Sequence, residues 1–236
     1  MTEQKAPMVS RRAAMQAVGA ATALAGGVAP GLAQADWSPD PHQMAERVFV
    51  IDGVAHCYNH MDYNRRIKRA AANSINTTYR YHTACTPERF RLTHENWSRD
   101  WQADEVADIM FLESHTDMMI MHSVPMYDLY YDGLVSNEKG AYLKGKYPDR
   151  VLWYGALDLF DPYDLVREKA DQLIGQGADG IKFYPTRINF ETQQAESWLM
   201  DDEKLAFPVF DYLQSKGVKH LAVHKLVGHV GPATAA

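Results

Sequence analysis

The sequence predicts an α/β protein built on parallel strands. Two observations predict this class: short apolar runs of strand length recur along the chain, and longer segments with apolar residues at helical spacing separate them. The runs lack the polar alternation of a half-exposed strand, as is typical of parallel strands buried on both faces. Their alternation with helices predicts βαβ units. Strands are expected at residues 48–51, 118–121, 151–154, 180–183 and 220–223.

Helices are expected between these strands. Asp161 and Pro162 are typical of a helix start, with the aspartate as cap and the proline in the first helical position. The glycines at 175 and 177 predict where that helix ends, and Lys216-Gly217 predicts a second stop. The other helices are expected at 104–114, 137–147 and 201–214.

The composition is that of an ordinary globular chain, with 46% apolar and 23% charged residues among 236. A formal net charge of -6 argues against nucleic acid or an anionic membrane surface as a partner. Cys57 and Cys85 are too few for a disulfide scaffold and lack the C-x-x-C spacing of a structural zinc site. They allow one disulfide without requiring it.

Residues 1–35 have the features of a twin-arginine signal peptide. Arg11 and Arg12 follow Ser10, residues 13–27 carry no charge, and small residues at 33 and 35 form a cleavage site before Asp36. The apolar stretch is too short and too weakly apolar to span a membrane. We expect cleavage after Ala35, a domain at 36–236 and a periplasmic or secreted destination. The alternative is an ordinary alanine-rich amphipathic helix.

Two segments are longer than a minimal βαβ unit requires, 58–100 and 187–200. In a parallel barrel the loops after the strands build the active site, so the first segment is expected to form a lid or a pocket wall. The alternative is a surface excursion without a role.

Polar side chains follow the predicted strands. Because the carboxyl ends of parallel strands lie at one edge of a sheet, these side chains are expected to gather there. Imidazoles and carboxylates at such an edge are suited to hold a zinc, iron or manganese ion. The alternative for each histidine is an ordinary hydrogen-bonded residue. The residues are Asp52, His56, His122, Asp158, Lys182 and His224.

Three of these strand segments, 48–56, 180–185 and 223–225, resemble the amidohydrolase superfamily, and most closely its amidohydrolase-2 group, which includes relatives of aminocarboxymuconate semialdehyde decarboxylase. The resemblance implies a TIM-like (β/α) barrel with one catalytic divalent metal ion, usually zinc. It implies that His56 and His224 are metal ligands, whereas the first histidine of the family's first-strand pair falls on Val54, which cannot bind metal.

The resemblance also implies a substrate pocket. Lys182 and His122 are expected to bind the substrate, with the lysine as the cation for a substrate carboxylate. Two alternatives for Lys182 are a carboxylated lysine that bridges two metals and a side chain that merely extends past apolar neighbours. His122 is alternatively a hydrogen-bonded residue at a strand end.

About five of the eight βα units of a complete barrel are expected in this chain, and the family's eighth-strand aspartate has no counterpart. The chain is interpreted as a portion of a longer enzyme; the alternatives are a half that assembles with another chain and an open-sheet protein without catalysis. The predicted function is that of a metal-dependent hydrolase or non-oxidative decarboxylase that acts on a small carboxylated molecule, with an aromatic or cyclic molecule as one option. The chain by itself is expected to be inactive. A homo-oligomer is one option for its assembly.

One alternative function is a non-catalytic binding protein on a degenerate barrel. A periplasmic α/β binding protein is disfavoured because the sequence has no paired-lobe repeat.

Overall fold

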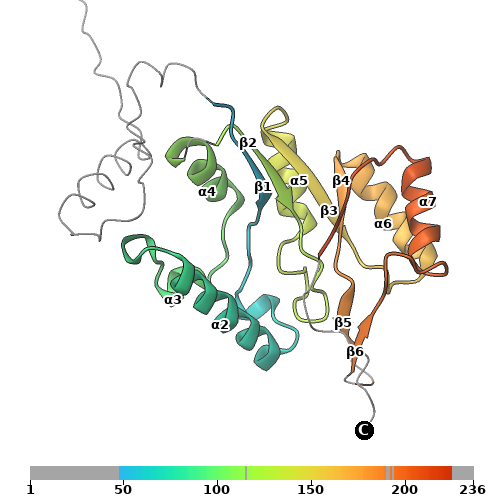
Figure 1. Ribbon diagram of the computed structural model, residues 1–236, viewed down its shortest axis with the longest axis horizontal. Helices are drawn as coiled ribbons and strands as arrows, with labels where there is room; N and C mark the ends of the chain where they lie inside the picture. Colours follow the sequence, from blue (N-terminus) through green and yellow to red (C-terminus); the bar gives the residue numbers. More distant parts are fainter. Residues whose placement is uncertain (1–47, 115, 190–191, 193, 225–236) are drawn as a thin grey trace, which may run out of the picture.

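A five-stranded parallel sheet forms the centre of the molecule. We describe it from a computed structural model in which residues 48–114, 116–189, 192 and 194–224 are placed; the predicted signal peptide and its cleavage site lie outside these residues. The strands are adjacent in the order β1-β2-β3-β4-β7 (Figure 1). Their bounds are β1 Ile51–Ala55, β2 Met118–His122, β3 Val151–Leu157, β4 Gly180–Phe183 and β7 Leu221–Val223.

Helices lie before or after the strands of this sheet in the sequence. Each strand of the sheet pairs in parallel with the strand of the same sheet that follows it in the sequence. The strand order therefore never reverses direction, as it does at the switch point of a doubly wound fold. The α/β class and the incomplete TIM-like barrel are therefore confirmed. The helices are α4 Ala103–Asp108, extended by a π-helical turn at Ile109–Glu113, α5 Asn137–Lys146, α6 Tyr163–Gly175 and α7 Ala206–Ser215.

The two long segments form additions to this frame. The first contains the 18-residue helix α2 (Lys68–Cys85) and the short helix α3 (His94–Trp97), with 3-10 turns at Asp62–Asn64 and Glu88–Phe90 (Figure 1). The second contains an antiparallel pair, β5 (Thr186–Ile188) and β6 (Ala195–Ser197). Both additions follow the carboxyl end of a strand.

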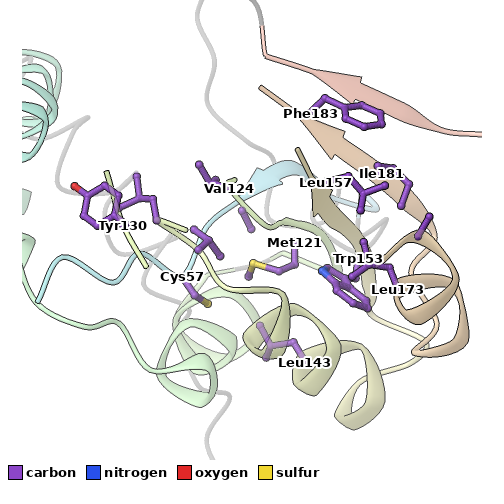
Figure 2. Packing of buried hydrophobic residues seen from close by; sticks show 14 of the residues in the cluster. Cys57, Met121, Val124, Tyr130, Leu143, Trp153, Leu157, Leu173, Ile181 and Phe183 are labelled. Atoms are coloured by element: carbon purple, nitrogen blue, oxygen red, sulfur yellow. The ribbon is translucent and has the colours of Figure 1, made fainter. Parts of the chain in front are cut away.

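The core lies between the sheet and the helices α5 and α6 (Figure 2). Trp153 of β3 is fully buried against α5, and its indole Nε1 donates a hydrogen bond to Ser123 Oγ at 3.0 Å. Gly140 of α5 makes this contact possible, because a Cβ built there would lie 2.8 Å from Trp153 Cε2 and still closer to Nε1. A glycine is therefore required where α5 crosses the indole.

Three predicted boundaries differ from the structure. The first strand begins at Ile51 rather than residue 48, because its register with β2 starts at the pair Ile51 and Met118. Asp161 does not cap α6: Pro162 is the cap residue, and the Asp161 carboxylate instead pairs with Lys169 at 2.6 Å. The last helix begins at 206 rather than 201, because 201–205 form a turn around the Asp202 carboxylate.

The predicted helix at 104–114 is also different in kind. It is α-helical only as far as Asp108 and continues as a π-helix.

The cysteines are both free, with Cys57 buried and Cys85 exposed, so the optional disulfide does not form. No helix in the described part of the chain is long and apolar enough to cross a bilayer.

Candidate functional site

The four residues singled out from the sequence lie together at the carboxyl edge of the sheet. His122 is the last residue of β2, Lys182 lies in β4, and His56 and His224 directly follow β1 and β7. The rings of His56 and His122 are 6.1 Å apart between centroids. The charge of Lys182 lowers the pKa of all three imidazoles, so the lysine lies within electrostatic range of each. The structure therefore brings the four residues together.

His56 and His122 are linked through backbone carbonyls. His56 Nδ1 lies 3.1 Å from the carbonyl oxygen of His122, and His122 Nε2 lies 3.1 Å from that of Gly53. A carbonyl only accepts, so each of these nitrogens carries the proton and the other ring nitrogen keeps a lone pair. In His122 that nitrogen is Nδ1, which is buried without a partner among the described residues.

Burial keeps these imidazoles neutral. Desolvation lowers the pKa of His56 to about 4, although the hydrogen bond to the His122 carbonyl opposes the shift. The pKa values of His122 and His224 are lowered by burial first and by the charge of Lys182 second. Near neutral pH the three imidazoles of the site are therefore uncharged.

Lys182 is a buried cation with no counter-ion among the residues that the structure places. Its side chain is 8% exposed, and burial lowers the pKa of its ammonium group. No carboxylate of the described residues forms an ion pair with it; its Nζ lies 5.6 Å from the centroid of the Tyr184 ring. Burying an ammonium group without an anion is costly, so this position is suited to receive an anionic ligand.

Two tyrosines that the sequence analysis did not select form walls of this site. The ring of Tyr184 stacks on His224 at 4.3 Å and 5°, and that of Tyr58 stacks on His56 at 5.2 Å. Burial raises the pKa of both phenols, and Tyr58 further raises that of Tyr184, so the two phenols lie near each other. Tyr58 lies two residues after His56, and Tyr184 lies two residues after Lys182. In an extended chain, residues two apart point to the same side. This spacing is the feature of the sequence from which the two tyrosines could have been predicted as site residues.

The two strand-end aspartates behave differently. Asp52 is near the imidazoles, since its charge raises the pKa of His56 and His122, and its Oδ1 accepts the Val54 N–H at 2.8 Å. Asp158 does not join the group. It lines a separate cleft between α5 and α6, where Asp161, Arg187 and Asp128 are its charged neighbours. The expectation that all six polar strand-end residues gather is wrong for Asp158.

The histidines supply only part of a metal-ligand set. Neutral imidazoles are suited to bind a divalent ion, and the orphaned Nδ1 of His122 is a potential donor to one. Val54 is 58% exposed and has no donor atom. In the ranges that the structure describes, no three His, Cys, Asp or Glu side chains form a group that could hold a metal ion. These residues therefore do not complete a metal centre.

The site lies outside the large cleft between α5 and α6. A cleft of about 1220 Å³ lies between α5 and α6 and is lined by residues of the loop after β2 and of β5, none of them one of the histidines or Lys182. Because it is open and its lining is mostly polar, we treat it as a surface feature distinct from the sheet-edge site.

Comparison with known proteins gives one structural likeness. No protein-family model and no curated protein matches this chain. A crystal structure titled as an amidohydrolase II superposes with a TM-score of 0.45 at 15% sequence identity. The superposition covers 78% of this chain and 53% of that protein, so this chain spans about half of its length.

Proposed function

We propose that the sheet-edge site binds the carboxylate of a small, aromatic or cyclic molecule, and that the chain belongs to a metal-dependent hydrolase or non-oxidative decarboxylase of the amidohydrolase-2 kind. The single observation that carries the proposal is the buried, uncompensated ammonium group of Lys182. The strand segments that resemble the amidohydrolase superfamily support the choice of reaction class.

A carboxylate at Lys182 would offset the desolvation of the ammonium group with a charge-assisted hydrogen bond. The neighbouring imidazoles are neutral, so they do not compete with the lysine for the anion. The N–H groups of His56 and His122 are engaged by carbonyls, which holds both rings in fixed orientations. The flat faces of Tyr58 and Tyr184 suit a ring-shaped substrate.

Binding of benzoate tests this proposal, with benzamide as the uncharged molecule of the same shape. We expect benzoate to bind and benzamide to bind at least about tenfold more weakly, as measured by calorimetry, because only benzoate carries the charge that Lys182 needs. Lys182→Met should remove this preference. Lys219→Met is the matched control, since Lys219 is exposed and precedes β7 at the opposite edge of the sheet. Equal affinity for both probes would contradict the proposal.

The predicted cofactor is one divalent ion, zinc or alternatively manganese or iron, with His56 and His224 as ligands. When bound, such an ion polarises a substrate oxygen or lowers the pKa of a water molecule. Metal content of the purified protein, measured by mass spectrometry with and without His224→Ala, is the test. About one equivalent that is lost in the variant supports the assignment, whereas equal content in both proteins contradicts it.

The second candidate is a binding protein without catalysis, which the donor-free Val54 and the incomplete ligand set favour. It predicts the same discrimination between benzoate and benzamide without bound metal. The two measurements together therefore separate the candidates.

Export through the twin-arginine route is also a proposal, and the N-terminal sequence of the protein recovered from the periplasm, expected to begin at Asp36, would test it.

A further inference from the structure

Four buried polar atoms without a partner belong to three rings that lie close together. Among the described residues, no group forms a hydrogen bond with His60 Nδ1, His60 Nε2, Trp97 Nε1 or Tyr130 Oη, and all four atoms are shielded from solvent. The rings of Trp97 and Tyr130 each lie 6.5 Å from that of His60 between centroids. Native proteins provide partners for nearly all buried polar atoms. Four unpaired atoms in one cluster therefore indicate a place for a hydrogen-bonding ligand.

The three rings come from segments that the backbone holds side by side. A β-bridge between Asn59 and Asp100 ties the residue before His60 to the segment that follows α3. A second bridge joins Arg65 to Tyr130, in the loop after β2. The cluster is therefore positioned by backbone contacts between distant parts of the chain as well as by the packing of its rings.

The cluster is suited to an occupant that accepts hydrogen bonds. Trp97 Nε1 can only donate, Tyr130 Oη donates or accepts, and a neutral His60 carries one N–H group and one lone pair. Ser74 of α2 is close enough to lower the pKa of Tyr130, but it forms no hydrogen bond with Tyr130 Oη. Three N–H or O–H groups are thus available to one acceptor.

The charges that act on the cluster favour an anion. Those that shift the pKa of His60 belong to Arg65, His94 and Lys139, and all three are positive. Arg65 and Lys139 each have a carboxylate partner, yet no carboxylate is among the charges that shift this pKa. At Tyr130 the largest charge effect is again that of Arg65. A positive potential stabilises an anion relative to a neutral molecule or a cation.

We propose that His60, Trp97 and Tyr130 form a buried site for a small monovalent inorganic anion, with chloride as the simplest occupant. The anion accepts hydrogen bonds from the indole, the phenol and one N–H group of the imidazole. It must be small because His60 is 2% and Tyr130 0% exposed. None of the three residues belongs to the sheet-edge site, so the anion site does not depend on the proposed function.

Urea unfolding at pH 7 tests the site in sodium chloride from zero to about 200 mM. Sodium gluconate of the same ionic strength is the comparison, because gluconate is too large for so enclosed a site. An anion that binds only the folded state raises the urea midpoint with chloride concentration, whereas screening acts alike in both salts. The series is repeated in Lys182→Met, which has no ammonium group at the sheet edge to bind chloride.

Two tyrosine variants that each lose one hydroxyl group locate the anion. Tyr130→Phe should weaken chloride binding at least about tenfold, because it removes one of the three donors. Tyr79→Phe is the matched control: its ring lies 6.4 Å from that of Trp97, but its hydroxyl donates to the Leu92 carbonyl at 3.1 Å. Chloride affinity should be unchanged in this variant. Circular dichroism establishes that each variant is folded.

Bromide supplies a second measurement, since a heavy anion in contact with an indole quenches its fluorescence. We expect saturable quenching that is lost in Trp97→Phe and weakened in Tyr130→Phe. Equal urea midpoints in chloride and gluconate would overturn the proposal and assign the buried atoms to water. An equal loss of chloride affinity in both tyrosine variants would overturn it as well. A chloride effect that disappears in Lys182→Met would place the anion at the sheet-edge site instead.

Discussion

Lys182 and His60 are both buried polar side chains, and neither side chain has a hydrogen bond or an ion pair with another described residue, yet they differ in what their surroundings permit. Lys182 lies at the carboxyl edge of the sheet, with its Nζ 5.6 Å from the centroid of the Tyr184 ring. His60 is 2% exposed and enclosed by Tyr58, Trp97 and Tyr130, and neither of its ring nitrogens has a partner among the described residues. The first is suited to binding a substrate, whereas the second makes stability depend on pH.

His60 predicts a loss of stability in acid. Burial lowers its pKa to about 4, and the neighbouring charges of Arg65, His94 and Lys139 are all positive and lower it further. Because the pKa in the unfolded chain is about 6.5, the unfolded state binds the proton first, and stability falls between about pH 6.5 and about pH 4. The full shift corresponds to at most about 3 kcal/mol.

The variant His60→Leu removes this titration. We expect its unfolding free energy to lie within about 1 kcal/mol of the wild type at pH 7, since the imidazole makes no hydrogen bond there, and to exceed the wild type at pH 4.5. Urea unfolding at both pH values measures the difference. His56, whose pKa is also about 4, titrates in the same window and remains in both proteins, so only the difference between them reports on His60. Parallel pH profiles would contradict the assignment.

At the scale of an element, helix α5 contains two glycines with different surroundings. Gly140 faces the indole of Trp153, while a Cβ at Gly145 would have nothing within 4 Å. Alanine is a better helix former than glycine by about 1 kcal/mol, so the same substitution has opposite expected effects in one helix.

Gly140→Ala should destabilise the protein by about 1–3 kcal/mol because α5 must move away from β3, and Gly145→Ala should leave it unchanged or stabilise it by up to about 1 kcal/mol. Thermal or urea unfolding of the pair checks the prediction. A neutral effect of Gly140→Ala would mean that α5 does not pack on Trp153 as closely as the structure has it.

At the scale of the whole molecule, Lys139 connects the α2–α3 segment to the sheet. Its Nζ pairs with the Asp100 carboxylate and donates to the Trp101 carbonyl at 2.8 Å, so one α5 side chain holds the end of a segment that begins after β1. Both members of the ion pair are largely buried, and removal of one leaves the other charge without its partner.

Lys139→Met should therefore cost about 3 kcal/mol or more and expose the segment to proteases. Limited proteolysis is expected to cut first within residues 58–100, whereas the paired variant Lys139→Met with Asp100→Leu should recover part of the loss. Cleavage at the same sites and rates in Lys139→Met and the wild type would show that the ion pair does not hold the segment.

The sequence by itself determined the α/β class, the order of strands and helices, and the polar residues that follow the strands, because apolar runs and their spacing are local properties. Only the tertiary structure decided which of those residues share a site, since that depends on contacts between segments distant in sequence. It separated Asp158 from the imidazoles and added Tyr58 and Tyr184. It also buried Lys182 without an anion from the described part of the chain, and burial and pairing of this kind arise only when the strands lie side by side.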